Sequence, residues 1–296
     1  MPLFDGIMTK TKEKTEAKPE GELVQTVNKE NPVPETVDET TSQNETEATQ
    51  AKPKLTLVIP YRSDKAQGKE LLFALRSWAK NFLEDGYNVV VIGDMEDWLD
   101  KDKIDFIPYD NPSENPQVNM AEIIKLAVAS ELVADNFILT NDDIYLFRPV
   151  TLAHVAVPKY LGLLNPARFK GTYRKNMERT IDLLEKGGKK PLNFASHTPF
   201  LFNKERVVET FEKFPELSDG ALFSCLYFSL VPETPILTDW KVDNWHVSVV
   251  SPNPSRSAVD KYVMNKCFVN NAVSGYSEFL EQLLQRQFPD SSPYEL

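Results

Sequence analysis

Short apolar runs that alternate with amphipathic stretches are the feature of this sequence that most restricts its fold. Residues 55 to 60, LTLVIP, form a continuous apolar and β-branched run, which is typical of a strand buried on both faces of a parallel sheet. In residues 69 to 83, apolar side chains recur three and four positions apart, which predicts an amphipathic helix. The same alternation continues, with predicted strands at 88–94, 104–108 and 136–140 and a predicted helix at 119–132.

This order of elements predicts a single three-layer α/β sandwich of Rossmann type. The second half completes the sheet as a mixed one, with predicted strands at 159–164 and 199–203 and predicted helices at 204–214 and 276–288. In such folds ligands bind where loops leave the carboxyl ends of the strands. The sequence contains neither a GxGxxG motif nor a Walker loop, so it does not support a dinucleotide-binding or P-loop site.

Residues 1 to 54 differ from the rest of the chain. They contain Phe4 as their only aromatic residue and are rich in Glu, Thr, Lys, Pro and Asn. Such a composition cannot bury enough apolar area to offset the entropy of ordering. We therefore predict a disordered N-terminal arm over 1–54, which could dock on a larger assembly, and one folded domain over 55–296.

Charge and composition exclude several classes of protein. The net charge of -11 disfavours sequence-independent nucleic-acid binding, which needs basic side chains to neutralise phosphates. The basic segment 168–190 is a local exception and fits a solvated helix and loop. No apolar run reaches the length of a membrane span, and two cysteines, Cys225 and Cys267, form no disulfide framework. These features predict a cytoplasmic protein in a reducing compartment.

The most informative motif is the run of Asn141, Asp142 and Asp143 at the end of the predicted strand 136–140. Adjacent carboxylates resist burial unless a cation or hydrogen-bond donors lie opposite. The motif alone is compatible with a hydrolase pair, a metal site or a turn neutralised by Arg148. Its place at a strand end favours Mg²⁺ or Mn²⁺, because hard cations bind carboxylate oxygens and keep positions open for phosphate oxygens.

Several short blocks occur in the same order as the conserved blocks of the Stealth family, which comprises sugar-phosphate transferases. The resemblance covers roughly residues 57 to 272 and depends on the ordered set, because each block is short. The blocks are YRSDKAQGKELLFALRSWAKNF, DWL, VNMAEI, ILTNDDIYLFRPV, HTPFLFNKERVVETFEKFPE and NKCFVNNA. More broadly, the chain resembles glycosyltransferases of GT-A type.

By this resemblance, Asp142 and Asp143 would hold the metal and the diphosphate of a nucleotide-sugar donor, most simply a UDP-sugar, and His197 would match a functional histidine. The chain departs from the family at IPYRSD, where an Asp-rich opening is expected, and at Asn270 and Asn271, where acids are expected. We therefore favour a metal-dependent glycosyltransferase that acts on a glycan or another hydroxyl acceptor. The alternatives are Stealth-like transfer of sugar 1-phosphate and a catalytically silent glycan-binding or assembly protein.

Other candidates each have a structural alternative. Tyr61 could stack on the base and Arg62 could bind a phosphate, or both lie in a surface loop. Asp94 could accept hydrogen bonds from the ribose, or it caps a helix. His246 is a second candidate for a base or metal ligand.

Two further features extend this list. Arg256 could bind a phosphate or lie in a helix-capping loop. Trp240 and Trp245 could form an acceptor platform or pack in the core.

Overall fold

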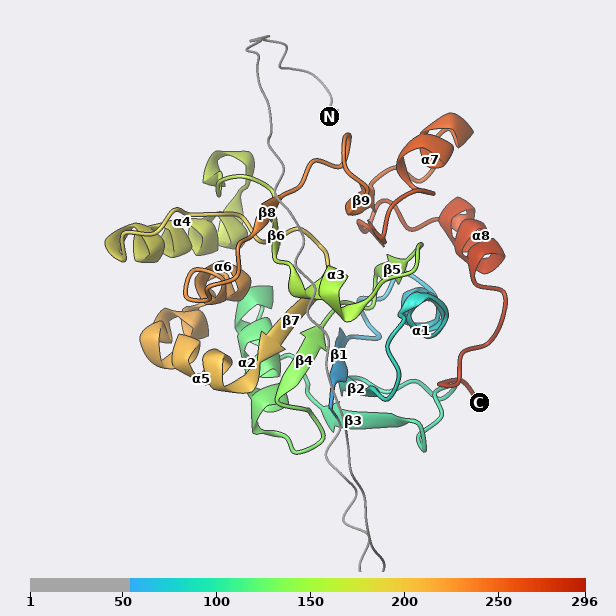
Figure 1. The fold of residues 1–296 in the computed structure, drawn as a ribbon, viewed down its shortest axis with the longest axis horizontal. Helices are drawn as coiled ribbons and strands as arrows, with labels where there is room; N and C mark the ends of the chain where they lie inside the picture. The colour runs from blue at the N-terminus through green and yellow to red at the C-terminus, as the bar shows by residue number, and fades with distance from the viewer. Residues whose placement is uncertain (1–53) are drawn as a thin grey trace, which may run out of the picture. The chain divides into compact units, whose positions relative to one another are not determined.

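The structure is a computed structural model and describes residues 54–296. The arm predicted for residues 1 to 54, with its docking on a larger assembly, lies outside the described residues except for Lys54. In the described part, a central mixed sheet is covered by helices on both faces, so the predicted three-layer α/β sandwich is confirmed (Figure 1). None of the helices between residues 54 and 296 has the length and apolar character needed to cross a membrane.

The central sheet has the strand order β3-β2-β1-β4-β7. Its strands are β1 (Thr56–Tyr61), β2 (Asn88–Gly93), β3 (Ile104–Pro108), β4 (Asn136–Leu139) and β7 (Phe200–Asn203). The first four are parallel to one another, and β7 is antiparallel to β4. The carboxyl ends of β1, β2 and β4 therefore meet at one edge of the sheet, where the architecture places ligands.

Successive side chains of β1 enter different cores, as the pleat of a strand requires. Val58 packs in the core under α2 (Pro116–Ala129), α4 (Gly171–Lys186), α5 (Lys204–Lys213) and α6 (Phe223–Tyr227). Leu57 and Ile59 pack on the opposite face, against α1 (Glu70–Asn81). Because both faces are covered, a continuous apolar run was needed in this strand.

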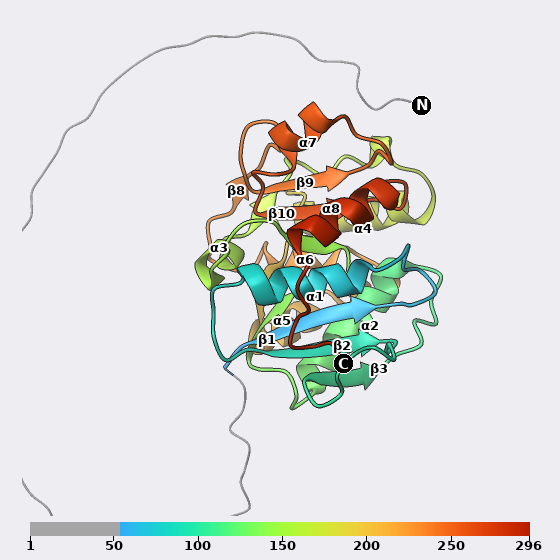
Figure 2. The same cartoon turned by 90° about the vertical axis from the view of Figure 1, so that its right-hand side faces the viewer.

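A second sheet, which was not predicted, packs on the face of α1 that points away from the central sheet (Figure 2). It consists of β5 (Ile144–Leu146), β10 (Phe268–Asn271) and β9 (His246–Val249), with α7 (Arg256–Tyr262) and α8 (Glu278–Gln287) packed on it. Helix α1 therefore lies between two sheets, and its polar residues Glu70 and Ser77 are buried as well as most of its apolar ones.

The predicted strand over 159–164 is wrong in extent. Only β6 (Lys159–Tyr160) forms, paired with β8 (Ile236–Leu237). The chain turns at Gly162, whose φ of 105° is outside the strand region, and this exposes Leu161 and Leu163. The remaining short elements are α3 (Leu152–Ala156) and the 3-10 turns Pro166–Arg168 and Pro215–Asp219.

Gly93, the last residue of β2, allows the close approach of β1 that positions Tyr61. Its φ is 131°, and a Cβ atom there would lie 2.0 Å from the backbone oxygen of Tyr61. We expect Gly93→Ala to lower the free energy of unfolding by about 2–4 kcal/mol, because it adds a backbone clash to the strain of positive φ. Gly86→Ala is the matched control, since Gly86 has φ 76° and open space around it. Equal losses of unfolding free energy in the two variants, measured with urea, would show that the backbone of β1 does not exclude a side chain at position 93.

Candidate active site

The turn Asn141–Asp143 connects the two sheets. Strand β4 ends at Leu139, and β5 begins at Ile144. The amide of Thr140 donates to the carbonyl of Val58 at 3.1 Å, so β1 holds the start of the turn. The two aspartates are therefore fixed at the carboxyl end of the central sheet, next to the first residues of α1.

Three carboxylates gather here: Asp142, Asp143 and Glu70. Both aspartates are half-buried and line a cavity. Burial, followed by the charges of Asp143 and Glu70, raises the pKa of Asp142 to about 8. Burial and then the charge of Glu70 raise the pKa of Asp143 to about 6. The Oδ1 atom of Asp143 is buried without a hydrogen-bond partner. The cluster is thus poised to gain from a cation.

Glu70 is a site residue that the sequence analysis missed. Its side chain is 4% exposed, accepts a hydrogen bond from the amide of Gln67 at 2.7 Å, and accepts another from Nδ2 of Asn271 at 2.6 Å. The hydroxyl of Tyr145 in turn donates to Oδ1 of Asn271 at 2.7 Å. A signal was present, because Glu70 lies one turn before the buried Phe73 and Ala74 and so falls on a buried face of the helix.

The carboxylates line a cavity of about 740 Å³, which we call the acidic cavity. This volume is within the range of small-molecule sites. Its walls also carry two cationic side chains, Arg62 and Lys65, together with polar groups of the 111–119 segment. Opposite charges therefore line one cavity, which suits an anionic ligand held partly through a cation.

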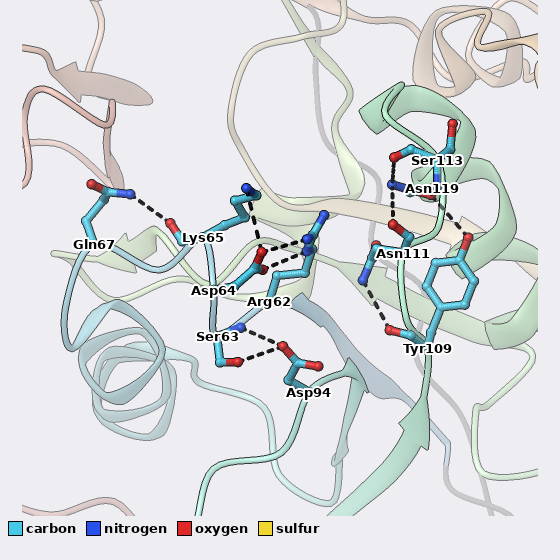
Figure 3. A network of polar contacts seen from close by, with 10 residues as sticks. All are labelled: Arg62, Ser63, Asp64, Lys65, Gln67, Asp94, Tyr109, Asn111, Ser113 and Asn119. Carbon is cyan, nitrogen blue, oxygen red and sulfur yellow. Dashed lines mark hydrogen bonds and ion pairs between the residues drawn. The ribbon is translucent and has the colours of Figure 1, made fainter.

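The loops after β1 and β2 form one wall of this region (Figure 3). Asp94 accepts hydrogen bonds from the backbone amide and the hydroxyl of Ser63, both at 2.8 Å. Arg62 forms a two-pronged contact with Asp64, at 2.9 and 2.8 Å. Tyr61 is buried and donates to Oε1 of Glu96 at 2.5 Å, and burial together with this contact raises the pKa of its hydroxyl. Asp94 thus fixes the loop that carries Arg62.

The opposite wall is held by Asn119, another residue that the sequence analysis missed (Figure 3). Its Oδ1 atom accepts from the amide of Ser113 at 3.0 Å and from the hydroxyl of Tyr109 at 3.3 Å, while its Nδ2 atom donates to the carbonyl of Ser113 at 2.7 Å. These bonds fix the loop that carries Asn111, whose φ is 49°. A non-glycine residue in this conformation indicates a backbone that its surroundings constrain.

His197 lies in a second cavity of about 480 Å³, which we call the aromatic cavity. The two cavities adjoin, because Met120 and Asn141 line both. His197 has φ 48°, and within residues 54–296 it shares this positive-φ conformation with no other non-glycine residue except Asn111. Although its ring is open to the cavity, the surrounding protein desolvates it and lowers its pKa, which keeps the imidazole neutral near pH 7.

His246 and Arg256 line neither cavity. His246 lies on β9 opposite Phe268, its Nδ1 atom is buried without a partner, and burial lowers its pKa to about 4. Arg256 begins α7, its side chain is 96% exposed, and it lies 3.9 Å from Asp260. The structure therefore does not bring these two residues to the aspartates.

The two tryptophans considered as an acceptor platform also lie outside both cavities. Trp245 packs over the ammonium group of Lys159 at 4.7 Å and against the ring of His154. Trp240 packs edge-on against Tyr262. Both make the packing contacts expected of core and loop residues.

The donor set fits a hard divalent cation. Among residues 54–296 no group of three or more His, Cys, Asp or Glu side chains converges as metal ligands. However, Mg²⁺ and Mn²⁺ sites that handle phosphates often use one or two carboxylates and complete their coordination with water and phosphate oxygens. Asp143, with its unpartnered buried oxygen, would be the direct ligand, and Asp142 would be the second carboxylate.

Because the pKa of Asp142 is raised, we expect the free energy of unfolding to depend on pH. A carboxyl group whose pKa is higher in the folded state than in the unfolded state destabilises the fold as pH rises between those two values. Relative to Asp142→Asn, the wild-type protein should therefore lose stability from pH 4 to about 8 and level off above that. We expect a difference on the order of 1 kcal/mol or more at pH 8.5 and little at pH 4. Urea unfolding of both proteins across this range measures it, and a constant difference would contradict the assignment.

Comparison with known proteins adds no family to this picture. No protein-family model matches the chain, and no curated protein sequence is detectably similar to it. The Stealth resemblance therefore stays a prediction. Among solved structures, the chain is similar to the crystal structure of galactosyltransferase LgtC in complex with donor and acceptor sugar analogs, with a TM-score of 0.46 and 11% identity over 80% of this chain and 98% of that one. A likeness this distant does not indicate an activity.

Proposed function

We propose that the chain is a glycosyltransferase that takes its sugar from a nucleoside diphosphate sugar. The observation that carries this proposal is the half-buried pair Asp142 and Asp143 beside Glu70, with the buried Oδ1 atom of Asp143 unpartnered, at the end of a parallel strand. Asp142 and Asp143 would hold a divalent cation, whose charge would offset their mutual repulsion and attract a diphosphate. Arg62 and Lys65 in the same cavity add positive charge for the phosphates.

The reaction would break the bond between the anomeric carbon and the diphosphate oxygen, which leaves with the bonding electrons. A new bond would form between that carbon and the hydroxyl oxygen of the acceptor, whose proton must be removed. A bound divalent cation would supply stabilisation of the charge that develops on the diphosphate. The chain itself would orient the two substrates in adjoining cavities.

His197 supports the proton transfer. Its ring lines the aromatic cavity, which adjoins the acidic cavity at Asn141, and its lowered pKa keeps a nitrogen free to accept a proton near pH 7. Asp142 and Asp143 would act in donor binding. Tyr61 would contribute only by packing, because its hydroxyl already donates a hydrogen bond to Glu96.

The released product tests this proposal against the Stealth-like alternative. Purified protein is incubated with Mn²⁺ and a panel of nucleotide sugars, and the nucleotides are separated by ion-exchange chromatography. Glycosyl transfer or slow hydrolysis at the anomeric carbon releases a nucleoside diphosphate. Release of a nucleoside monophosphate would instead show that attack occurs on phosphorus and would replace the proposed reaction by sugar-phosphate transfer.

A further inference from the structure

The aromatic cavity differs from the acidic cavity in charge. No Asp, Glu, Lys or Arg side chain lines the aromatic cavity, whereas the acidic cavity carries all four types. A diphosphate has no counter-charge in the aromatic cavity, so the two cavities are suited to different ligands. The occupant of the aromatic cavity must be uncharged where it contacts the walls, because burying an unpaired charge is costly.

The walls of this cavity are rich in flat, apolar side chains. Five aromatic rings come from separate parts of the fold: Phe169, Tyr173, Phe194, Phe200 and Phe223. Phe169 and the neighbouring Leu161 at the rim are 40% and 41% exposed. Aromatic side chains attract other rings in stacked or edge-on contacts beyond the gain from burial alone. Phe194, Phe200 and Phe223 are buried, whereas Phe169 and Tyr173 are accessible and can offer aromatic contacts to a planar apolar group.

Two residues that carry unpartnered polar groups line this cavity. Thr140 is 2% exposed and lines the cavity, and its Oγ1 atom is buried without a hydrogen-bond partner. His197 lines the cavity too, and its ring forms no hydrogen bond within the described residues. A buried hydroxyl left unpaired costs free energy. Thr140 precedes Asn141 in the sequence, and Asn141 and Met120 line both cavities.

We propose that the aromatic cavity is the acceptor subsite and that its acceptor is uncharged and carries an aromatic ring, as an aryl glycoside does. The assignment as acceptor subsite rests on the proposed function. The ring would lie among the aromatic walls, and a hydroxyl would reach His197 beside the donor. The two cavities adjoin at Met120 and Asn141, which line both.

The test compares three uncharged ligands with the same sugar: 4-nitrophenyl, hexyl and methyl β-glucoside, each titrated into the protein by calorimetry. The 4-nitrophenyl compound should bind about tenfold more tightly than the methyl compound, since stacking adds to apolar burial. It should also bind more tightly than the hexyl compound. Equal affinities, or the tightest binding by the hexyl compound, would overturn the proposal.

Substitutions in the aromatic cavity test whether the glucosides bind there. Phe169→Ala removes a half-exposed ring, and Ser224→Trp fills the cavity from α6; both should abolish the preference for the aryl compound. Leu83→Ala, at an exposed position outside both cavities, is the control and should keep it. Circular-dichroism melting establishes that each variant is folded. An unchanged preference in both folded cavity variants would overturn the proposal.

A separate titration with UDP and Mn²⁺ distinguishes failure of the aryl-acceptor inference from failure of the proposed glycosyltransferase function. Bound UDP without any aryl preference overturns this inference alone and leaves the proposed function standing. An aryl preference without binding of UDP or any other nucleoside diphosphate overturns the acceptor assignment together with the proposed function. Binding of UDP with the aryl preference supports both.

Discussion

Asp143→Asn is expected to abolish Mn²⁺-dependent binding of UDP, with a loss in affinity on the order of 100-fold or more. The substitution replaces the carboxylate whose buried Oδ1 atom lacks a partner. The apo protein should be as stable as the wild type or more stable, because the change also removes one of three neighbouring negative charges. Free Mn²⁺, followed by electron paramagnetic resonance in the presence of UDP, measures the affinity, and urea unfolding measures the stability.

Asp182→Asn is the matched control for this prediction. Asp182 lies on the exposed face of α4 and lines neither cavity, so the variant loses the same charge without touching the site. Its Mn²⁺ affinity should equal that of the wild type. Strong destabilisation of apo Asp143→Asn, with Mn²⁺ binding unchanged, would instead assign the aspartates to a structural network.

His197→Ala is expected to lower turnover by about 100-fold, the scale of lost general-base assistance, with a small change in stability. The base must be neutral, and desolvation lowers the pKa of His197. Turnover in the wild type should therefore rise with pH through a value below the usual histidine pKa of about 6.5. This acid limb should disappear in the variant, which a pH profile of kcat detects.

His246→Ala tests the alternative histidine by the same assay. His246 is buried on β9 outside both cavities, so its loss should reduce stability more than turnover. Near-normal turnover in His197→Ala together with collapse in folded His246→Ala would transfer the role to His246.

Strands β1 and β2 could be predicted because they are almost completely buried. Such segments must be mostly apolar, which separates them clearly from the amphipathic helices. The order of strands and helices also placed Asp142 and Asp143 at a carboxyl end of the sheet. Two features of the chain were enough for this: the end of β4 at Leu139 and its parallel pairing with β1.

The second sheet could not be predicted because its strands are short and their partners are distant in sequence. Strand β5, Ile144–Leu146, pairs with Phe268–Asn271, and no local pattern encodes that pairing. The same long-range contact brings Asn271 to Glu70, so this part of the site was hidden as well. Likewise, the aromatic cavity is built from separate segments such as Tyr173 and Phe223, which meet only after folding.

The most direct test of the central claim is a calorimetric titration of the wild-type protein with UDP, in the presence and absence of Mn²⁺. It needs no knowledge of the sugar or the acceptor. Because Asp142 and Asp143 carry adjacent negative charges, UDP alone should bind weakly, and Mn²⁺ should increase its affinity at least tenfold at pH 8. Nucleotide affinity that does not depend on Mn²⁺, or no binding of UDP or any other nucleoside diphosphate in either condition, would contradict a metal-assisted nucleotide-sugar site.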